Sequence, residues 1–386
     1  MTTAAEGTTT ISPELAERAE QHDLLTLGIE EEYLLVDAVE PRGVEAVEAV
    51  LAEVPEELRP SVQHEYLRSQ IEVASPPQLE LTGLREAMVS LRTGLADAAE
   101  RAGSRLVAVG CGPAAGPSSR LVDEPRYHRM RERFGDLSPG QGVCGTHVHV
   151  SIPDEETGVQ VLNLLRPWLP TLQAATANSP LAGGRDTGYA SWRSMMWERW
   201  PTVGPTPYLR SHEHYLTLIA DLQASGAMLD EGMLYWYARL SARYPTVEIR
   251  MGDVMPTLDD AMLLAALARA LVATLVAEVR AGREGPEVSY PLLTAAHWRA
   301  AKDGLEGLGL DLATRETRPA WRLLRQLVDY VHPQLERHGD AELVTDLLER
   351  LRERGTGAAR QRALLAKGTP VAGVVDWLAR TTRGEM

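Results

Sequence analysis

A two-faced strand is predicted by the stretch Leu25-Thr-Leu-Gly-Ile-Glu-Glu-Glu-Tyr-Leu-Leu-Val36. Alternate residues of a strand point to opposite faces of its sheet. The even-numbered face carries Glu30 and Glu32, whereas the odd-numbered face is mostly apolar. Glu31 falls on that apolar face, so we expect it near a sheet edge or in solvent, outside any functional site.

Two later stretches show the same division into a polar and an apolar face. In Val143-Cys-Gly-Thr-His-Val-His-Val-Ser-Ile152, His147 and His149 share one face and aliphatic residues occupy the other. In Thr246-Val-Glu-Ile-Arg-Met-Gly-Asp-Val254, Glu248 and Arg250 share a face opposite three apolar side chains. Three such strands in one sheet would form a concave face rich in carboxylates and histidine.

A face of this composition is suited to divalent cations. Carboxylate oxygens favour Mg²⁺ or Mn²⁺, and Mn²⁺ accepts a histidine ligand more readily. The alternative is a solvated sheet face without a ligand, which the threefold recurrence of the pattern disfavours. Structural zinc is disfavoured because neither Cys111 nor Cys144 is spaced as a zinc ligand.

A fourth segment, His64-Glu-Tyr-Leu-Arg-Ser-Gln-Ile-Glu-Val-Ala74, adds Glu65 and Glu72. Their numbers differ in parity, so they cannot share one face of a regular strand. Either a bend separates the two carboxylates, or only Glu72 faces the site.

The remaining pattern predicts an α+β protein with a helical C-terminal third. We expect one domain over residues 24–386, preceded by a partly disordered tail over residues 1–23. Further expected elements are a strand at Arg105–Gly110 and helices at Leu84–Gly103, Gly158–Ala177, Leu258–Gly282, Pro319–His338 and Ala341–Arg354.

Composition excludes several classes of function. The 386 residues carry 39 Lys+Arg against 54 Asp+Glu, a formal net charge of −15, which argues against a nucleic-acid partner. The most apolar stretch, Ala261–Val279, is interrupted by Arg269 and Glu278, so we expect no membrane span. The acidic N-terminus lacks a signal-peptide pattern, and the chain has two cysteines, so we expect a cytoplasmic protein.

Several motifs together resemble the type 2 glutamate-cysteine ligases, also called the YbdK-like carboxylate-amine ligase family. The matching stretches extend over nearly the whole chain from about residue 24. They are Thr26–Glu32, Gly145–Val150, Ser179–Thr187, Pro245–Arg250 and the C-terminal Gly355-Thr-Gly-Ala-Ala-Arg-Gln-Arg362.

The resemblance implies a glutamine-synthetase-like catalytic domain, in which a mainly antiparallel sheet with helices on one side holds ATP and divalent metal. The implied reaction phosphorylates the γ-carboxylate of glutamate and couples it to an amine, cysteine by family default. By the family pattern Arg250 would hold the transferred phosphate. The implied metal ligands are Glu30, Glu32, Glu65, Glu72, His147 and Glu248.

The resemblance agrees with the charge of the chain. ATP and glutamate are anions, and a protein of charge −15 does not attract them through its overall field. Binding must therefore rest on metal ions, Mg²⁺ or Mn²⁺, and on local arginines. Phosphoryl transfer itself mainly requires positioning and charge stabilisation.

A segment rich in tryptophan and arginine, Ser191-Trp-Arg-Ser-Met-Met-Trp-Glu-Arg-Trp200, supplies such arginines. A guanidinium fork between aromatic walls suits a substrate carboxylate, and we place Arg193 in the substrate site. The alternative is that the tryptophans fill core and the arginines are solvated, and Arg199 is the less secure of the two. For His149 we favour a contact near the nucleotide over metal ligation or a purely structural role.

Alternatives to the ligase remain open. Paired glutamates with His-x-His could build a two-metal hydrolase, and the same fold could serve a ligand-binding regulator. The acceptor could be another amino acid or amine, and the C-terminal third could form a homodimer. Cys144 is expected to be inert core, and a P-loop is excluded because the segment after Gly110 lacks a Gly-Lys-Ser/Thr ending.

Overall fold

A central antiparallel sheet organises the chain. The computed structural model describes residues 11–116, 120–137 and 142–385. The sheet has seven strands in the order β2-β3-β1-β5-β9-β8, with β4 also paired to β1. The strands are β1 (Leu27–Asp37), β2 (Val62–His64), β3 (Gln70–Ala74), β4 (Ser104–Val107), β5 (Gly145–Ser151), β8 (Ala238–Leu240) and β9 (Thr246–Asp253).

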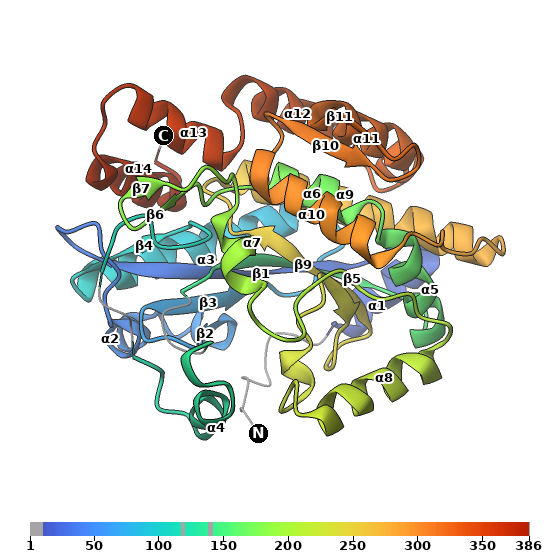
Figure 1. The fold of residues 1–386 in the computed structure, drawn as a ribbon, viewed down its shortest axis with the longest axis horizontal. Helices are drawn as coiled ribbons and strands as arrows, with labels where there is room; N and C mark the ends of the chain where they lie inside the picture. Colours follow the sequence, from blue (N-terminus) through green and yellow to red (C-terminus); the bar gives the residue numbers. More distant parts are fainter. Residues whose placement is uncertain (1–10, 117–119, 138–141, 386) are drawn as a thin grey trace.

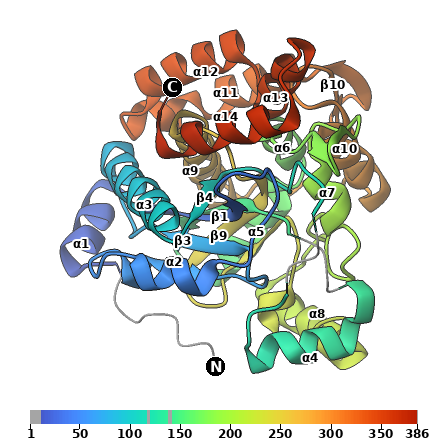
Figure 2. The ribbon, with the colours of Figure 1, turned by 90° about the vertical axis from the view of Figure 1, so that its left-hand side faces the viewer.

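Helices cover mainly one face of this sheet. In Figure 1 the helices of the C-terminal third lie above the sheet, whereas α4 and α8 lie below it, and Figure 2 shows these two helices together. The helices of the first half are α1 (Pro13–His22), α2 (Val47–Glu53), α3 (Leu81–Arg101), α4 (Pro125–Phe134), α5 (Glu155–Leu165), α6 (Leu169–Ala175) and α7 (Trp192–Trp197). Those of the second half are α8 (His212–Ser225), α9 (Leu258–Arg280), α10 (Tyr290–Asp303), α11 (Ala320–Arg337), α12 (Ala341–Arg354), α13 (Gly357–Ala366) and α14 (Val371–Arg383).

Two short hairpins complete the fold. One pairs β6 (Leu181–Ala182) with β7 (Arg185–Asp186), and the other pairs β10 (Leu308–Asp311) with β11 (Glu316–Pro319). The expected α+β architecture, with helices on one side and a helical C-terminal third, is confirmed.

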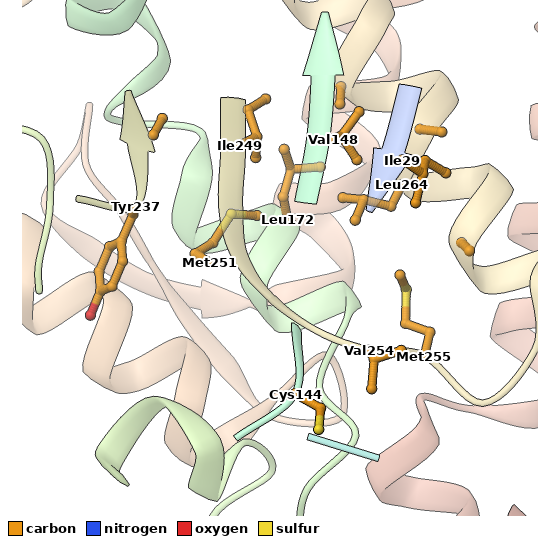
Figure 3. Packing of buried hydrophobic residues seen from close by; sticks show 14 of the residues in the cluster. Ile29, Cys144, Val148, Leu172, Tyr237, Ile249, Met251, Val254, Met255 and Leu264 are labelled. Carbon is orange, nitrogen blue, oxygen red and sulfur yellow. The ribbon is translucent and has the colours of Figure 1, made fainter. Parts of the chain in front are cut away.

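The core lies between the apolar sheet face and the helices. Ile29, Val148 and Ile249 project from three neighbouring strands, and Leu264 of α9 and Leu172 of α6 belong to the same buried cluster (Figure 3). Cys144 lies in this core, as the sequence indicated. Burial of the odd-numbered residues of β1 fixes its register, because a slip by one residue would move every side chain to the other face.

Helix α9 is the central helix of this layer. Its N-cap Thr257 accepts a hydrogen bond from the backbone N–H of Asp260, and Asp259 and Asp260 provide the acidic first turn. Among the described residues it is the one helix long and apolar enough to cross a membrane, but 78% of its most apolar window is buried inside the protein. Its apolar character is therefore explained by core packing.

Two expected elements differ in the structure. The single helix expected at Gly158–Ala177 is two helices, α5 and α6, because Pro167 and Pro170 cannot donate backbone hydrogen bonds to a continuous helix. The segment expected to be a tail contains α1, whose N-cap Ser12 accepts from the N–H of Leu15. Residues 1–10 of that segment lie outside the described residues.

Candidate metal and substrate site

Strand register aligns the polar residues in a row across the sheet. Glu32 lies opposite Glu72 of β3, and Glu30 lies opposite His147 of β5. His149 in turn lies opposite Glu248 of β9. Directly opposed side chains on one face are neighbours. The register therefore brings together residues that are far apart in sequence.

A β-bulge interrupts the pairing of β5 with β9 at this row. Val148 pairs with Ile249 and Thr146 with Gly252, so two residues of β9, Arg250 and Met251, oppose the single residue His147. Bulges commonly redirect a side chain near a functional site. Met251 stays in the core (Figure 3), and Arg250 lies on the same side as Glu248.

His147 is the centre of the row. Its Nδ1 lies 3.3 Å from Glu30 Oε2 and 3.7 Å from Glu248 Oε1, and its Nε2 lies 3.7 Å from Glu32 Oε1. One possible ligand atom from each of Glu30, His147 and Glu248 falls within 4.8 Å of the others. This trio is a donor set of the kind that holds a divalent cation.

Cationic neighbours control the charge of two of these carboxylates. Burial raises the pKa of Glu30, but the imidazoles of His149 and His147 outweigh this and hold it well below its ordinary value. Burial acts against Glu248 as well, yet Arg239, Arg250 and the two histidines lower its pKa to about 2. Both groups are therefore ionised at neutral pH.

The carboxylates at the β2–β3 end experience the opposite environment. Burial and the Glu32 charge raise the pKa of Glu65 to about 7. Burial together with Glu30, Glu65 and Glu32 raises the pKa of Glu72 well above its ordinary value. Carboxylates are therefore crowded together here and resist ionisation, and a bound cation would favour their ionised forms.

A turn resolves the parity conflict between Glu65 and Glu72. Strand β2 ends at His64 and β3 begins at Gln70, so Glu65 lies in the connection between them. Because the chain bends in this connection, the Glu65 carboxylate lies close enough to Glu72 to raise its pKa. The bend, one of the two alternatives left by the sequence, is the one observed.

Arg193 and Arg250 both lie close to the ring of one tryptophan, Trp197. The Cζ atoms of Arg193 and Arg250 lie 4.9 and 5.4 Å from the ring centroid of Trp197, and Arg250 also lies over Tyr235. A side-chain carbon at Gly145 would come within 2.3 Å of Arg193 Nη2, so glycine is needed for this approach. Gly145 N–H in turn donates to Glu32 Oε2 over 2.6 Å.

His149 lies on the same strand as His147 and contacts Glu30 as well. Its Nε2 lies 3.3 Å from Glu30 Oε1, and its Nδ1 lies 3.0 Å from Thr246 Oγ1. Burial alone would lower the pKa of His149, but Glu30 and Glu248 raise it above its ordinary value. The imidazole can therefore act as a cationic or hydrogen-bonding group beside the cluster.

The expectation that Glu31 lies near a sheet edge or in solvent is wrong. Glu31 is fully buried on the apolar face, where Arg92 of α3 donates to both of its oxygens over 2.6 and 2.8 Å. Tyr33 Oη donates to the same carboxylate. The partner comes from a helix 61 residues away, so strand alternation alone could not reveal that this charge is neutralised inside the core.

Arg239 is the main site residue that sequence reasoning missed. Its Nε and Nη2 donate to the two oxygens of Glu248 over 2.7 and 3.2 Å, and Arg239 lies directly opposite Glu248 in the sheet. The only signal was an arginine between Ala238 and Leu240, and β8 is three residues long. A strand of three residues is too short to show an alternation of polar and apolar side chains.

Arg199, the less secure of the two arginines considered for the substrate site, is exposed and follows the end of α7.

Comparison with known proteins shows the family of the chain. The model for the family described as glutamate-cysteine ligase family 2 (GCS2) matches residues 26–381. The chain belongs to glutamate-cysteine ligase family 2. The protein named "Putative glutamate--cysteine ligase 2" from Salinispora arenicola is 52% identical over 360 residues, covering 93% of this chain and 95% of its own length. A Mycobacterium sp. (strain KMS) relative of similar name is 44% identical over 92% of this chain and 98% of its own.

Two solved structures share the fold of this protein. A bifunctional glutathione synthetase from Pasteurella multocida matches with a TM-score of 0.70 and 16% identity, covering 96% of this chain but 53% of that longer chain. Glutamate-cysteine ligase from Francisella tularensis, in complex with AMP, matches with a TM-score of 0.67 and 13% identity, covering 94% and 89%. The glutamine-synthetase-like ligase fold is confirmed, and the chain is an enzyme of the ligase class.

Proposed function

We propose that this protein is an ATP-dependent carboxylate-amine ligase that couples the γ-carboxylate of glutamate to an amine. The γ-phosphoryl group of ATP passes to a carboxylate oxygen and leaves ADP. The amine nitrogen then attacks the acyl carbon, and phosphate departs. Cysteine is the acceptor we favour, because the relatives of this family carry that name.

The observation that carries the proposal is the convergence of Glu30, His147 and Glu248 beside Arg250 in a member of this family. The donor set fits Mg²⁺ or Mn²⁺, because it combines carboxylate oxygens with one imidazole. When bound, such an ion neutralises phosphate charge during transfer. The residues we propose to hold it are Glu30, Glu32, Glu65, Glu72, His147 and Glu248.

Arg250 is proposed to hold the transferred phosphoryl group. Its Nη1 donates to Leu234 O over 3.2 Å, and its Nε lies 3.2 Å from Glu248 Oε1. Contact with Trp197 and Tyr235 fixes the plane of the guanidinium. A guanidinium fixed in this way can stabilise equatorial phosphoryl oxygens without reorganising during the reaction.

Arg193 and His149 complete the substrate contacts that we propose. Arg193 is buried against Trp197, where it can bind a substrate carboxylate with water excluded. For His149, which lies beside Glu30, we propose a contact with the nucleotide. The substrates are thus small molecules, and we expect the reaction to occur in the cytoplasm.

A phosphate-release screen tests this function. Purified protein is given ATP, Mg²⁺, glutamate and a panel of amines that includes cysteine, and the products are identified by mass spectrometry. We expect ADP and phosphate in equal amounts with a γ-glutamyl amide, only when carboxylate and amine are both present. Hydrolysis of a substrate without ATP would instead support the two-metal hydrolase.

A further inference from the structure

A buried polar cluster lies directly behind Arg193. Its centre is Asp253, the last residue of β9, which is 1% exposed. Its carboxylate accepts hydrogen bonds from Asn178 N–H, Ser179 Oγ and Ser191 Oγ over 2.8, 2.6 and 2.7 Å. A buried carboxylate with three fixed donors is rigid, because each lost bond would leave a buried polar group unpaired.

This cluster fixes the backbone of α7. Ser191 is the N-cap of the helix and accepts from the N–H of Ser194. Ser179 Oγ accepts from the backbone N–H of Arg193 over 3.0 Å. Both hydroxyls that bind Asp253 therefore also bind α7, so the carboxylate determines where the first turn of this helix begins.

The guanidinium of Arg193 depends on that backbone. Its Nη1 donates to Met251 O over 3.2 Å and its plane contacts Trp197, but its buried Nε has no hydrogen-bond partner among the described residues. Trp197 belongs to the same six-residue helix. A shift of α7 would therefore move the guanidinium and its aromatic wall together.

The C-terminal motif reaches the same cluster from the other side. Gln361 of α13 is fully buried, and its Nε2 donates to Asn178 Oδ1 over 2.7 Å and to Asn178 O over 3.1 Å. A side-chain carbon at Gly357 would lie 2.2 Å from Asn178 Oδ1, so glycine permits this close packing. The C-terminal motif thus contacts Asn178, which is the residue next to Ser179 in the chain.

We propose that Asp253 and Gln361 are positioning residues for Arg193, linking the C-terminal motif Gly355–Arg362 to the substrate site through Asn178, Ser179 and Ser191. The inference rests on the proposed function, in which Arg193 binds a substrate carboxylate. The proposal gives the C-terminal motif a role in turnover. Gln361 of this motif does not contact Arg193 directly and acts through Asn178 and Ser179.

Single variants give the first readout. Asp253→Asn keeps the shape but removes the charge. Its amide N–H₂ replaces one acceptor oxygen and therefore faces one or two of the three donors, while the remaining oxygen still accepts. We expect kcat/KM for glutamate to fall about 10- to 100-fold, as for other small misplacements of a binding group. The matched control is Asp340→Asn, which alters another buried carboxylate, paired with Arg269 of α9, and should leave kcat/KM of the folded protein within about twofold.

A double-mutant cycle with Arg193→Met separates positioning from general destabilisation. If Asp253 acts through Arg193, Asp253→Asn should lower kcat/KM by less than about twofold in the Arg193→Met background. An equal fold-loss of kcat/KM on Asp253→Asn in the wild type and in the Arg193→Met variant would overturn the inference. Gln361→Ala provides the same cycle if Asp253→Asn does not fold.

The same data separate this inference from the proposed function. Normal kcat/KM in Arg193→Met would overturn both the carboxylate role of Arg193 and the positioning inference, while γ-glutamyl amide formation by the wild type would still support the ligase reaction. Failure of the wild type to couple glutamate to any amine would overturn the proposed function itself.

Discussion

The neighbours of the glutamates in this candidate site shift their pKa values in opposite directions. Glu248 is held by the fork of Arg239 and by Arg250, which keep its pKa at about 2. Glu65, buried beside another carboxylate, has a pKa of about 7. Identical side chains within one site thus differ in how readily they are protonated, because one has cations as neighbours and the other has anions.

His297 makes stability depend on pH. It is buried, contacts Gln173 and packs on Tyr237, and burial lowers its pKa to about 3. His297 of the unfolded chain binds a proton near pH 6.5 and that of the folded chain does not, so the contribution of His297 to stability is complete above that pH and is lost between about 6.5 and 3. The expected slope is about 1.4 kcal/mol per pH unit.

Urea unfolding at pH 7 and pH 5 measures this effect. The His297 contribution should lower the free energy of unfolding by about 2 kcal/mol between these pH values. The variant His297→Gln should show a correspondingly shallower pH dependence. An unchanged dependence in that variant would show that His297 does not supply the slope.

At the scale of single residues, the sequence predicted faces but not partners. Alternation placed Glu30 and Glu32 correctly because their odd-numbered neighbours are mostly apolar. It failed at Glu31 because the compensating charge, Arg92, comes from a distant helix. It also missed Arg239, since its strand is too short to show a pattern.

At the scale of elements, the division into faces identified β1, β5 and β9, and the composition identified α9 and α12. Strand order and the β9 bulge could not be predicted, because they depend on pairing between segments about 100 residues apart. Those two features determine that Glu30, His147 and Glu248 meet. The candidate residues could therefore be named from the sequence, whereas their arrangement depends on the fold.

The buried pair Glu31–Arg92 joins three elements. Besides Glu31 of β1, Arg92 of α3 donates to Met255 O and Pro256 O, which follow β9. Removing one partner leaves an uncompensated buried charge, so Arg92→Met or Glu31→Gln should each cost about 3–5 kcal/mol of unfolding free energy. The double variant should lose less than the sum of the two.

Chemical denaturation of the three variants measures this coupling. The control is Arg101→Met, which removes an ion pair with Glu53 on the surface and should cost less than about 1 kcal/mol. Strictly additive losses in the double variant would contradict the proposed interdependence of Glu31 and Arg92.

At the scale of the whole molecule, a protein of charge −15 is proposed to bind two anions. The fold resolves this by concentrating guanidinium groups, two buried and one partly buried, beside an acidic sheet face. Arg193, Arg239 and Arg250 all lie beside the Glu30–His147–Glu248 trio or the tryptophan next to it. Substrate attraction is therefore local, and the remaining charge opposes it.

Mn²⁺ binding, followed by electron paramagnetic resonance with and without ATP, tests the proposed cation site most directly. Wild-type protein should bind Mn²⁺, and Glu30→Gln and Glu248→Gln should each weaken binding at least about tenfold, since each removes a charged ligand. Glu45→Gln, at a surface carboxylate paired with Arg120, should bind as the wild type does. Equal Mn²⁺ affinity in the wild type and both site variants would show that this sheet face is not a cation site.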